Sequence, residues 1–208
     1  MESDERLRLL EAAVEQSSDA VLITDADLDD GPTIVYANTA FQRMSGYDWG
    51  ELAGATPRLL QGPATDRALM ARLRATLEAG QSFEGETTNY RRDGQPYQVE
   101  WRISPVRAGA DGTITHFVSV QRDVTERDQR DKQMQLLSTA VEESADPLLI
   151  TNAKGTITYV NRAFERQTGY SREEVLGGNP RLLKSGHHDA AFYQSLWQTI
   201  LGGETFRA

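Results

Sequence analysis

Apolar residues recur with the period of a helix in some segments and with the period of a strand in others. Leu7, Leu10 and Val14 fall on one helical face, which predicts an N-terminal helix. Short apolar runs at 20–25 and 33–38 predict two strands, and helical segments follow them, including one whose stripe is formed by Leu69, Leu73 and Leu77. Alternating segments at 82–90, 96–106 and 113–124 predict three longer strands joined by hairpins. This order predicts an α+β domain, in which helices cover one face of a five-stranded antiparallel sheet.

The alternation within the three long strands predicts which side chains face the helices. Asn89 shares its face with Phe83 and Thr87, and Gln121 shares its face with Phe117 and Ser119. On the middle strand the inward set is Tyr97, Val99, Trp101 and Ile103. The opposite face of the third strand is also apolar, through His116, Val118 and Val120, so we expect a helix or a second subunit to cover it.

The first half of this pattern occurs twice in the chain. AVEQSSDAVLITD at 13–25 recurs as AVEESADPLLITN at 140–152, and YANTAFQRMSGY at 36–47 recurs as YVNRAFERQTGY at 159–170. The first copy carries four extra residues around Leu28 to Pro32, which predicts an inserted loop. Nothing after the second copy matches residues 86–124, so we expect this domain to lack about half of its sheet.

These repeats predict the organisation of the chain: an N-terminal helix (1–18), a first domain (19–125), a helical linker (126–143) and a truncated second domain (144–208). Thr125 is a candidate N-cap for the linker helix. Met134, Leu137 and Val141 form a narrow apolar seam on that helix. The seam fits a two-stranded coiled coil, and a solvated linker helix is the alternative.

Composition excludes several classes of function. The formal net charge of −9 argues against nucleic acid or an anionic membrane as a partner. There is no cysteine, which excludes disulfides and thiolate catalysis, and with only three histidines in the chain a three-histidine metal site is nearly excluded. No apolar run is long enough to span a bilayer and the N-terminus is charged, so we expect a cytoplasmic protein. No nucleophile–base set or glycine-rich phosphate loop is present, so we do not expect an enzyme.

The two inward amides, Asn89 and Gln121, are the candidate ligand contacts that the residues alone provide. A buried amide without partners costs about 1–3 kcal/mol per unsatisfied group. The pair therefore predicts either a bound polar ligand or a polar network in which the amides bond to each other or to water.

Both copies resemble PAS domains. The resemblance rests on the Y-x-N-x-A-F…G-Y pattern in each copy and on the D-V-T sequence that follows the last strand of the first copy. The first copy also resembles the flavin-binding LOV type of PAS domain, through GATPRLLQGPATD at 54–66, NYRRDG at 89–94 and FVSVQRDVT at 117–125. This resemblance implies that Arg58 and Arg74 hold the phosphate end of a flavin, that Gln61 and Asn89 contact it, and that Gln121 lies beside its N5 and O4 atoms. A surface role is the alternative for both arginines, and it is the favoured one for Arg74 taken by itself.

The first copy departs from the LOV pattern at three positions. Pro57 replaces the photoactive cysteine, while Thr56 and Val99 replace asparagines that contact the flavin. No cysteinyl–flavin bond can therefore form. The inward residues Val99, Trp101, Phe117 and Ser119 remain candidates for lining the pocket, and Trp101 is either a neighbour of the flavin or a core aromatic. In the second copy Arg181 is retained, but Lys184 replaces Gln61 and Trp197 replaces Arg74, which argues against flavin there.

Flavin-binding PAS domains without the cysteine resemble the redox sensors of nitrogen-fixation and methane-oxidation regulators, which implies FAD in preference to FMN. We therefore expect the sensory input region of a signal-transduction protein, a sensor histidine kinase of a two-component system, that senses redox state or oxygen and signals through the linker helix. The alternatives are a blue-light sensor that works by flavin photoreduction and a cofactor-free dimerisation module. The expected partners are a second copy, joined through helices or the outer sheet face, a C-terminal output domain and a response regulator.

Overall fold

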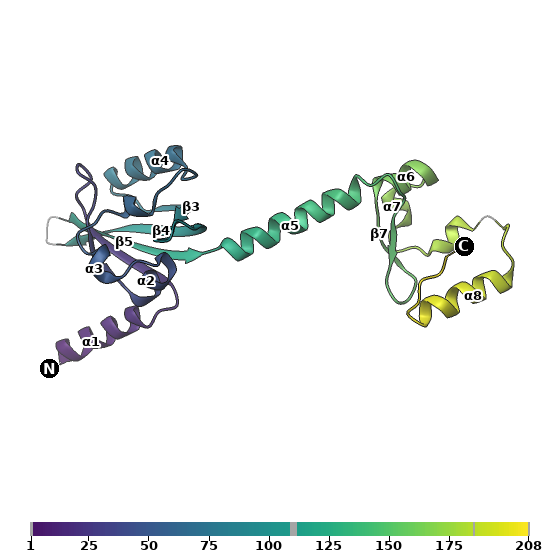
Figure 1. Cartoon of the computed structure of the whole chain (residues 1–208), viewed down its shortest axis with the longest axis horizontal. Helices are drawn as coiled ribbons and strands as arrows, with labels where there is room; N and C mark the ends of the chain where they lie inside the picture. Colours follow the sequence, from purple (N-terminus) through teal and green to yellow (C-terminus); the bar gives the residue numbers. More distant parts are fainter. Residues whose placement is uncertain (1, 109–111, 185, 208) are drawn as a thin grey trace. The chain divides into compact units, whose positions relative to one another are not determined.

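The computed structural model describes residues 2–108, 112–184 and 186–207, with only the backbone of Glu2 and Ser3. The chain forms two compact units, Met1–Asp131 and Lys132–Ala208. Helix α5 (Thr125–Glu142) runs from the first unit into the second. Figure 1 shows the helices and strands of both units.

The first unit is an α+β domain with a five-stranded antiparallel sheet, as predicted. Helix α1 (Glu2–Glu15) precedes the sheet, and α2 (Thr39–Ser45), α3 (Trp49–Leu52), the 3₁₀ turn η1 (Pro57–Leu60) and α4 (Arg67–Glu78) follow the first two strands. The spatial order of the sheet is β2-β1-β5-β4-β3. Its strands are β1 (Ala20–Asp25), β2 (Ile34–Ala37), β3 (Phe83–Tyr90), β4 (Pro96–Ala108) and β5 (Thr113–Asp123).

The inner face of the sheet contains the side chains that the alternation predicted. Asn89, Val99, Trp101 and Gln121 are all buried. In the register of the sheet, Gln121 lies opposite Ala20 of β1 and Trp101 of β4. A continuous inner surface therefore runs from β1 to β3, and Gln121 lies near its middle.

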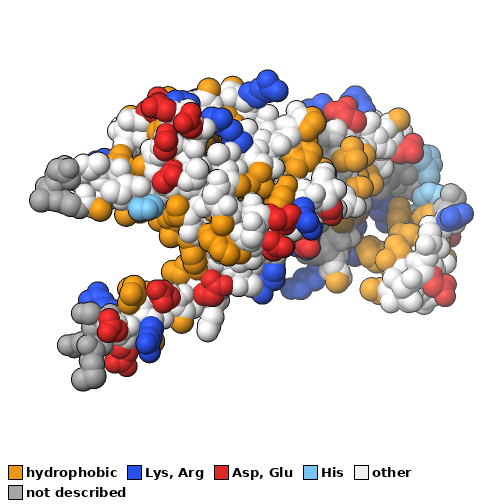
Figure 2. Space-filling model, turned by 60° about the vertical axis from the view of Figure 1, so that its left-hand side comes forward, with side chains coloured by type: hydrophobic (Ala, Val, Ile, Leu, Met, Phe, Trp, Pro, Cys, Tyr) orange, Lys and Arg blue, Asp and Glu red, His pale blue; other side chains and the backbone are white. Residues whose placement is uncertain are grey.

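The outer face keeps apolar residues at its surface. Val120 is 41% exposed and Val106 is 38% exposed, and on α1 Leu7 and Leu10 are more than half exposed. Figure 2 shows hydrophobic side chains interspersed with charged ones along this helix. The cover expected over β5 is thus incomplete among the described residues of this chain.

Local capping sets the helix boundaries, with one departure from prediction. Asn38 accepts a hydrogen bond from Phe41 N as the N-cap of α2, and Gly46, at φ +77°, ends that helix. The N-cap prediction for Thr125 is wrong, because this residue is the first of α5. Its hydroxyl is used elsewhere, accepting from Gln98 N at 2.9 Å and donating to Asp123.

The second unit repeats the first half of the fold. Its elements are β6 (Leu149–Thr151), β7 (Ile157–Val160), α6 (Arg162–Thr168), α7 (Arg172–Val175), η2 (Pro180–Leu183) and α8 (Ala190–Leu201). The buried core is Ile157, Val160, Phe164 and Val175. Among the described residues, no counterpart of β3, β4 and β5 follows α8. No helix within the described ranges is long and apolar enough to cross a membrane.

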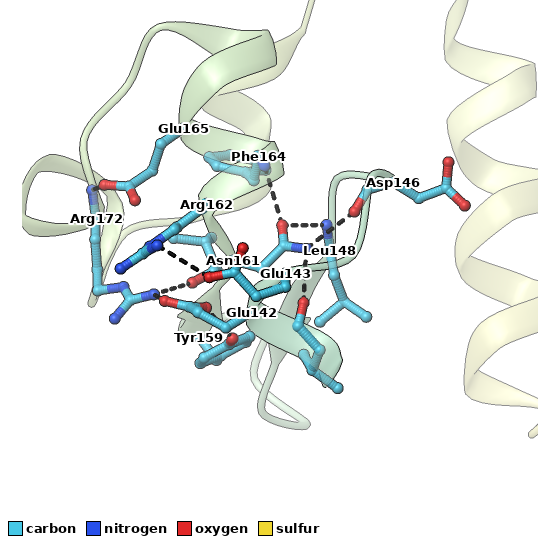
Figure 3. Close-up of polar contacts among 12 residues, drawn as sticks. Glu142, Glu143, Asp146, Leu148, Tyr159, Asn161, Arg162, Phe164, Glu165 and Arg172 are labelled. Carbon is cyan, nitrogen blue, oxygen red and sulfur yellow. Dashed lines mark hydrogen bonds and ion pairs between the residues drawn. The ribbon is translucent and has the colours of Figure 1, made fainter. Parts of the chain in front are cut away.

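Each unit binds the end of the helix that precedes it through one buried asparagine. Asn38 donates to Val14 O and Asp19 O and accepts from Val21 N and Phe41 N, at 2.9–3.0 Å. Asn161 makes the equivalent four bonds at 2.8–3.0 Å, including one to Val141 O on α5 (Figure 3). The sequence pattern indicated only the capping half of this role.

A tyrosine–glutamate pair repeats beside each asparagine. Tyr36 donates to Glu15 at 2.7 Å, and Tyr159 donates to Glu142 in the second unit. Figure 3 shows that Arg172 also binds Glu142 from the start of α7. The end of α5 is therefore held to the second unit by both backbone and charged side-chain contacts.

Candidate functional site

A cavity of about 350 Å³ lies in the first unit between α4 and the inner face of the sheet. Its volume lies within the range of small-molecule sites, which are typically about 300–1,000 Å³. Most of its lining is apolar, from Leu22, Leu28, Pro32, Met70, Leu73, Leu77, Ile103 and Phe117. A flat, largely apolar ligand with a few polar atoms at its edge suits such a lining.

Seven of the ten predicted site residues border this cavity: Thr56, Arg58, Gln61, Arg74, Phe117, Ser119 and Gln121. Pro57, which stands where LOV domains carry the photoactive cysteine, borders it as well. The other three, Asn89, Val99 and Trp101, lie on the inner face of β3 and β4 but outside the cavity lining. The Trp101 ring packs on Phe83 with centroids 5.6 Å apart, so it is a core aromatic in this structure.

Sequence reasoning missed two parts of the lining. Leu28 and Pro32 come from the inserted loop, and Met70, Leu73 and Leu77 come from α4. The insertion was itself a signal that the loop is special, but nothing in its composition indicated where it lies. The leucine stripe of α4 predicted core packing, and a cavity beside a core helix has the same apolar pattern.

Gln121 carries an unpaired polar atom at the wall of the cavity. The residue is 7% exposed, and its Nε2 donates to Ser119 Oγ at 3.1 Å. Its Oε1 is buried without a hydrogen-bond partner. The alternative in which the two buried amides bond to each other is therefore not the arrangement present. Because an unmet buried acceptor is costly, the geometry favours a ligand with polar atoms at this point.

A second buried polar atom lies further along the inner face. The hydroxyl of Tyr97 lies beside the side chain of Asn89, its cross-strand neighbour, but makes no hydrogen bond of ordinary geometry. Burial raises the pKa of Tyr97 to about 12, so the hydroxyl stays protonated. The guanidinium of Arg91 lies 4.5 Å from the centre of its ring.

Two arginines lie at the edge of the cavity and differ in their partners. Arg74 Nε contacts Glu78 Oε1 at 2.7 Å, and its Nη2 lies 3.9 Å from Asp29 Oδ1. Arg58 is exposed and makes no ion pair within the part of the chain that the structure describes. The cavity thus has one engaged and one available cation, both suited to an anionic group.

The strand that carries Gln121 is tied to the linker helix two residues later. Asp123 accepts from Thr125 N at 2.9 Å and from the Arg91 guanidinium. Burial alone would raise the pKa of Asp123, but the hydrogen bonds from Thr125 and Arg91 outweigh it and hold the pKa below its ordinary value. The carboxylate is therefore charged at neutral pH and joins β5, the end of β3 and the start of α5.

The second unit has no counterpart of Arg74. Trp197 stands at the position of Arg74, and its ring lies 3.7 Å from where a Cβ on Gly155 would be. Lys184, which replaces Gln61, lies over the ring of Tyr193 at 4.8 Å. In the second unit, an indole and a lysine stacked on an aromatic ring thus occupy the positions that Arg74 and Gln61 have at the cavity of the first unit.

Comparisons with known proteins agree with this geometry. A family model described as "PAS domain" matches residues 18–126, and one described as "PAS fold" matches residues 135–208. Two similar curated proteins are blue-light-activated histidine kinases. The one from Brucella anthropi is 40% identical over 141 residues, and the one from Brucella ovis is 37% identical over 157 residues. The matches cover 66% and 74% of this chain but only 28% and 32% of those kinases.

Two solved structures are also similar to part of this chain. One, described as an RNA-binding Light-Oxygen-Voltage receptor, superposes with a TM-score of 0.59 at 34% identity, covering 66% of this chain and 38% of that one. The other is a Light-Oxygen-Voltage domain studied with a flavin analogue, with a TM-score of 0.52 at 29% identity, covering 65% of this chain and 96% of that one.

Proposed function

This chain belongs to the PAS family, with two PAS domains in tandem, and we propose that its first domain is a LOV-type flavin sensor of blue light that works without a photoactive cysteine. The chain would be the sensory input region of a signal-transduction protein. Its output would be a histidine kinase acting on a response regulator, and the protein would form a dimer.

The unpaired Oε1 of Gln121 at the wall of a mostly apolar cavity carries this proposal. The residues present fit a flavin nucleotide, because the slot is apolar, an amide lies at its wall and two guanidinium groups lie at its edge. Likeness to blue-light-activated kinases supports light as the signal. It does not support the expected redox or oxygen sensing, nor the preference for FAD, and we propose FMN instead.

A bound flavin would supply absorption of blue light and the capacity to accept electrons. The apolar side chains of α4 and β5 would exclude water from its ring. Arg58 and Arg74 would hold the phosphate, and Gln121 would bond the polar edge of the ring. The terminal amide of Gln121 offers both a donor and an acceptor, so it can rotate when the proton count at that edge changes. Because residue 57 is a proline and offers no thiol, the Gln121 amide would be the group that responds to this change in protonation.

The signal would leave through β5 and α5. Rotation of Gln121 changes the bond it makes with Ser119 on the same strand. Two residues after Gln121, Asp123 accepts a hydrogen bond from Thr125 N at the start of α5. The hydroxyl of Thr125 accepts from Gln98 N, which ties this end of the helix to β4. At its other end α5 is held by Asn161, which donates to Val141 O, and by Arg172, which binds Glu142. A helix fixed at both ends would transmit a small shift to whatever follows the second domain.

Absorption spectroscopy tests the function directly. The purified chain, supplied with FMN and FAD, should take up FMN and show a flavin spectrum. Blue light in the presence of a mild electron donor should change that spectrum together with the hydrogen–deuterium exchange of residues 125–131. Failure to bind either nucleotide would end the proposal. A change in α5 that follows dithionite but never follows light would favour the redox function.

Replacing Gln121 with leucine should separate binding from signalling. Leucine retains the approximate volume of glutamine, so flavin should remain bound. The light-dependent change in exchange at residues 125–131 should fall to less than about a fifth of its wild-type size, because the amide that bonds Ser119 is gone. Hydrogen–deuterium exchange of dark and illuminated samples measures this.

Ser119→Ala is the matched variant for this experiment. It removes the present partner of the Gln121 Nε2 but leaves the amide itself, so the change in α5 should be reduced and not lost. A full wild-type response in Gln121→Leu would show that the signal leaves the cavity by another route.

A further inference from the structure

The inserted loop at residues 28–32 meets both arginines of the cavity. Leu28 and Pro32 border the cavity directly. Gly31 is buried at φ +100°, and a Cβ added to it would lie 3.3 Å from Cζ of Arg58. Asp29 approaches Arg74 from the same loop. The second copy is shorter by four residues here and has Trp197 in place of Arg74.

The two arginines have different surroundings. Backbone of the loop lies beside Arg58, whereas carboxylates lie beside Arg74. Gly31 allows the Arg58 guanidinium to lie against the loop backbone, and any side chain at that position would crowd it. Asp29 and Glu78 instead supply carboxylates to Arg74. A phosphate at the cavity edge would therefore find Arg58 available, but would compete with two carboxylates for Arg74.

We propose that this loop is a specificity element that sets how strongly the first domain prefers a phosphorylated flavin over an unphosphorylated one. The inference rests on the proposed function, since it concerns the ligand of the same cavity. Asp29 and Glu78 hold Arg74 away from full engagement with phosphate. Arg58, shaped by Gly31, makes the main phosphate contact.

The test compares FMN with riboflavin, which has the same ring and no phosphate. An exposed ion pair contributes about 0.2–1 kcal/mol, so removing the carboxylate of the loop in an Asp29→Asn variant should tighten FMN binding about two- to fivefold. Riboflavin binding should not change. Arg58→Gln should weaken FMN about tenfold or more and leave riboflavin unchanged. Isothermal titration or quenching of flavin fluorescence measures the dissociation constants.

Glu84→Gln provides the control, because Glu84 is an exposed carboxylate that pairs with Arg102 on β4 and lies outside the cavity lining. It should leave the ratio of FMN to riboflavin affinity as in the wild type. The loop has no such role if Asp29→Asn binds FMN as the wild type does, or if the affinities for both ligands change in parallel. A wild-type chain that binds neither ligand would instead refute the proposed function.

Discussion

Replacing Pro57 with cysteine is expected to give the domain a reversible, thiol-dependent loss of blue absorbance in light. Pro57 borders the cavity at the start of η1, in the position of the LOV cysteine. A thiol there would lie against a bound flavin and could form a bond to it. The loss should approach completion under saturating light and recover in the dark, whereas the wild type should show no such cycle. Absorption spectra before, during and after illumination measure it.

Pro57→Ser is the matched control, since it makes the same change of backbone freedom and adds a hydroxyl of similar size. It should bind flavin and respond as the wild type does. If Pro57→Cys binds flavin but never shows the thiol-dependent cycle, the ring does not lie against η1. The placement of the ligand beside Pro57 would then be wrong, even with the cofactor correct.

The fold was predictable because its strands and helices each have a simple period. The inward set of β5, Phe117, Ser119 and Gln121, follows from alternation alone, and burial confirms it. Thr125 was not predictable in the same way. Its hydroxyl can cap a helix or bond a neighbouring strand, and only the position of Gln98, brought near by the fold, decides between them.

The site was predictable only where a motif names its residues. The LOV-like segment at 54–66 placed Arg58 and Gln61 at the cavity, and the structure has them there. Asn89 and Trp101 share the inner face with Gln121, but the side chains of Phe83 and Tyr97 fill the space around them. Alternation identifies a face of a sheet. It cannot identify which part of that face is packed and which part is hollow.

Replacing Asn38 with alanine is expected to destabilise the first unit by about 3–5 kcal/mol, because the change leaves four backbone groups without their partner. Asn38 is fully buried, so water cannot readily replace the amide. For a domain of about 100 residues, this loss corresponds to a fall in melting temperature of roughly 15–30 °C. Thermal and urea unfolding followed by circular dichroism measure it.

Asn152→Ala makes the same substitution at an exposed turn of the second unit, where the side chain accepts from Lys154 N and Thr156 N, and it should destabilise that unit by about 1 kcal/mol or less. The equivalent buried change, Asn161→Ala, should increase hydrogen exchange at residues 134–142 of α5 and leave residues 125–131 protected, because its bond to Val141 O holds only that end of the helix.

A loss of less than about 1 kcal/mol in Asn38→Ala would mean that the end of α1 is held mainly by Glu15 and Tyr36. The paired asparagines would then be ordinary caps, and the connection between helix and domain would rest on the tyrosine–glutamate pairs.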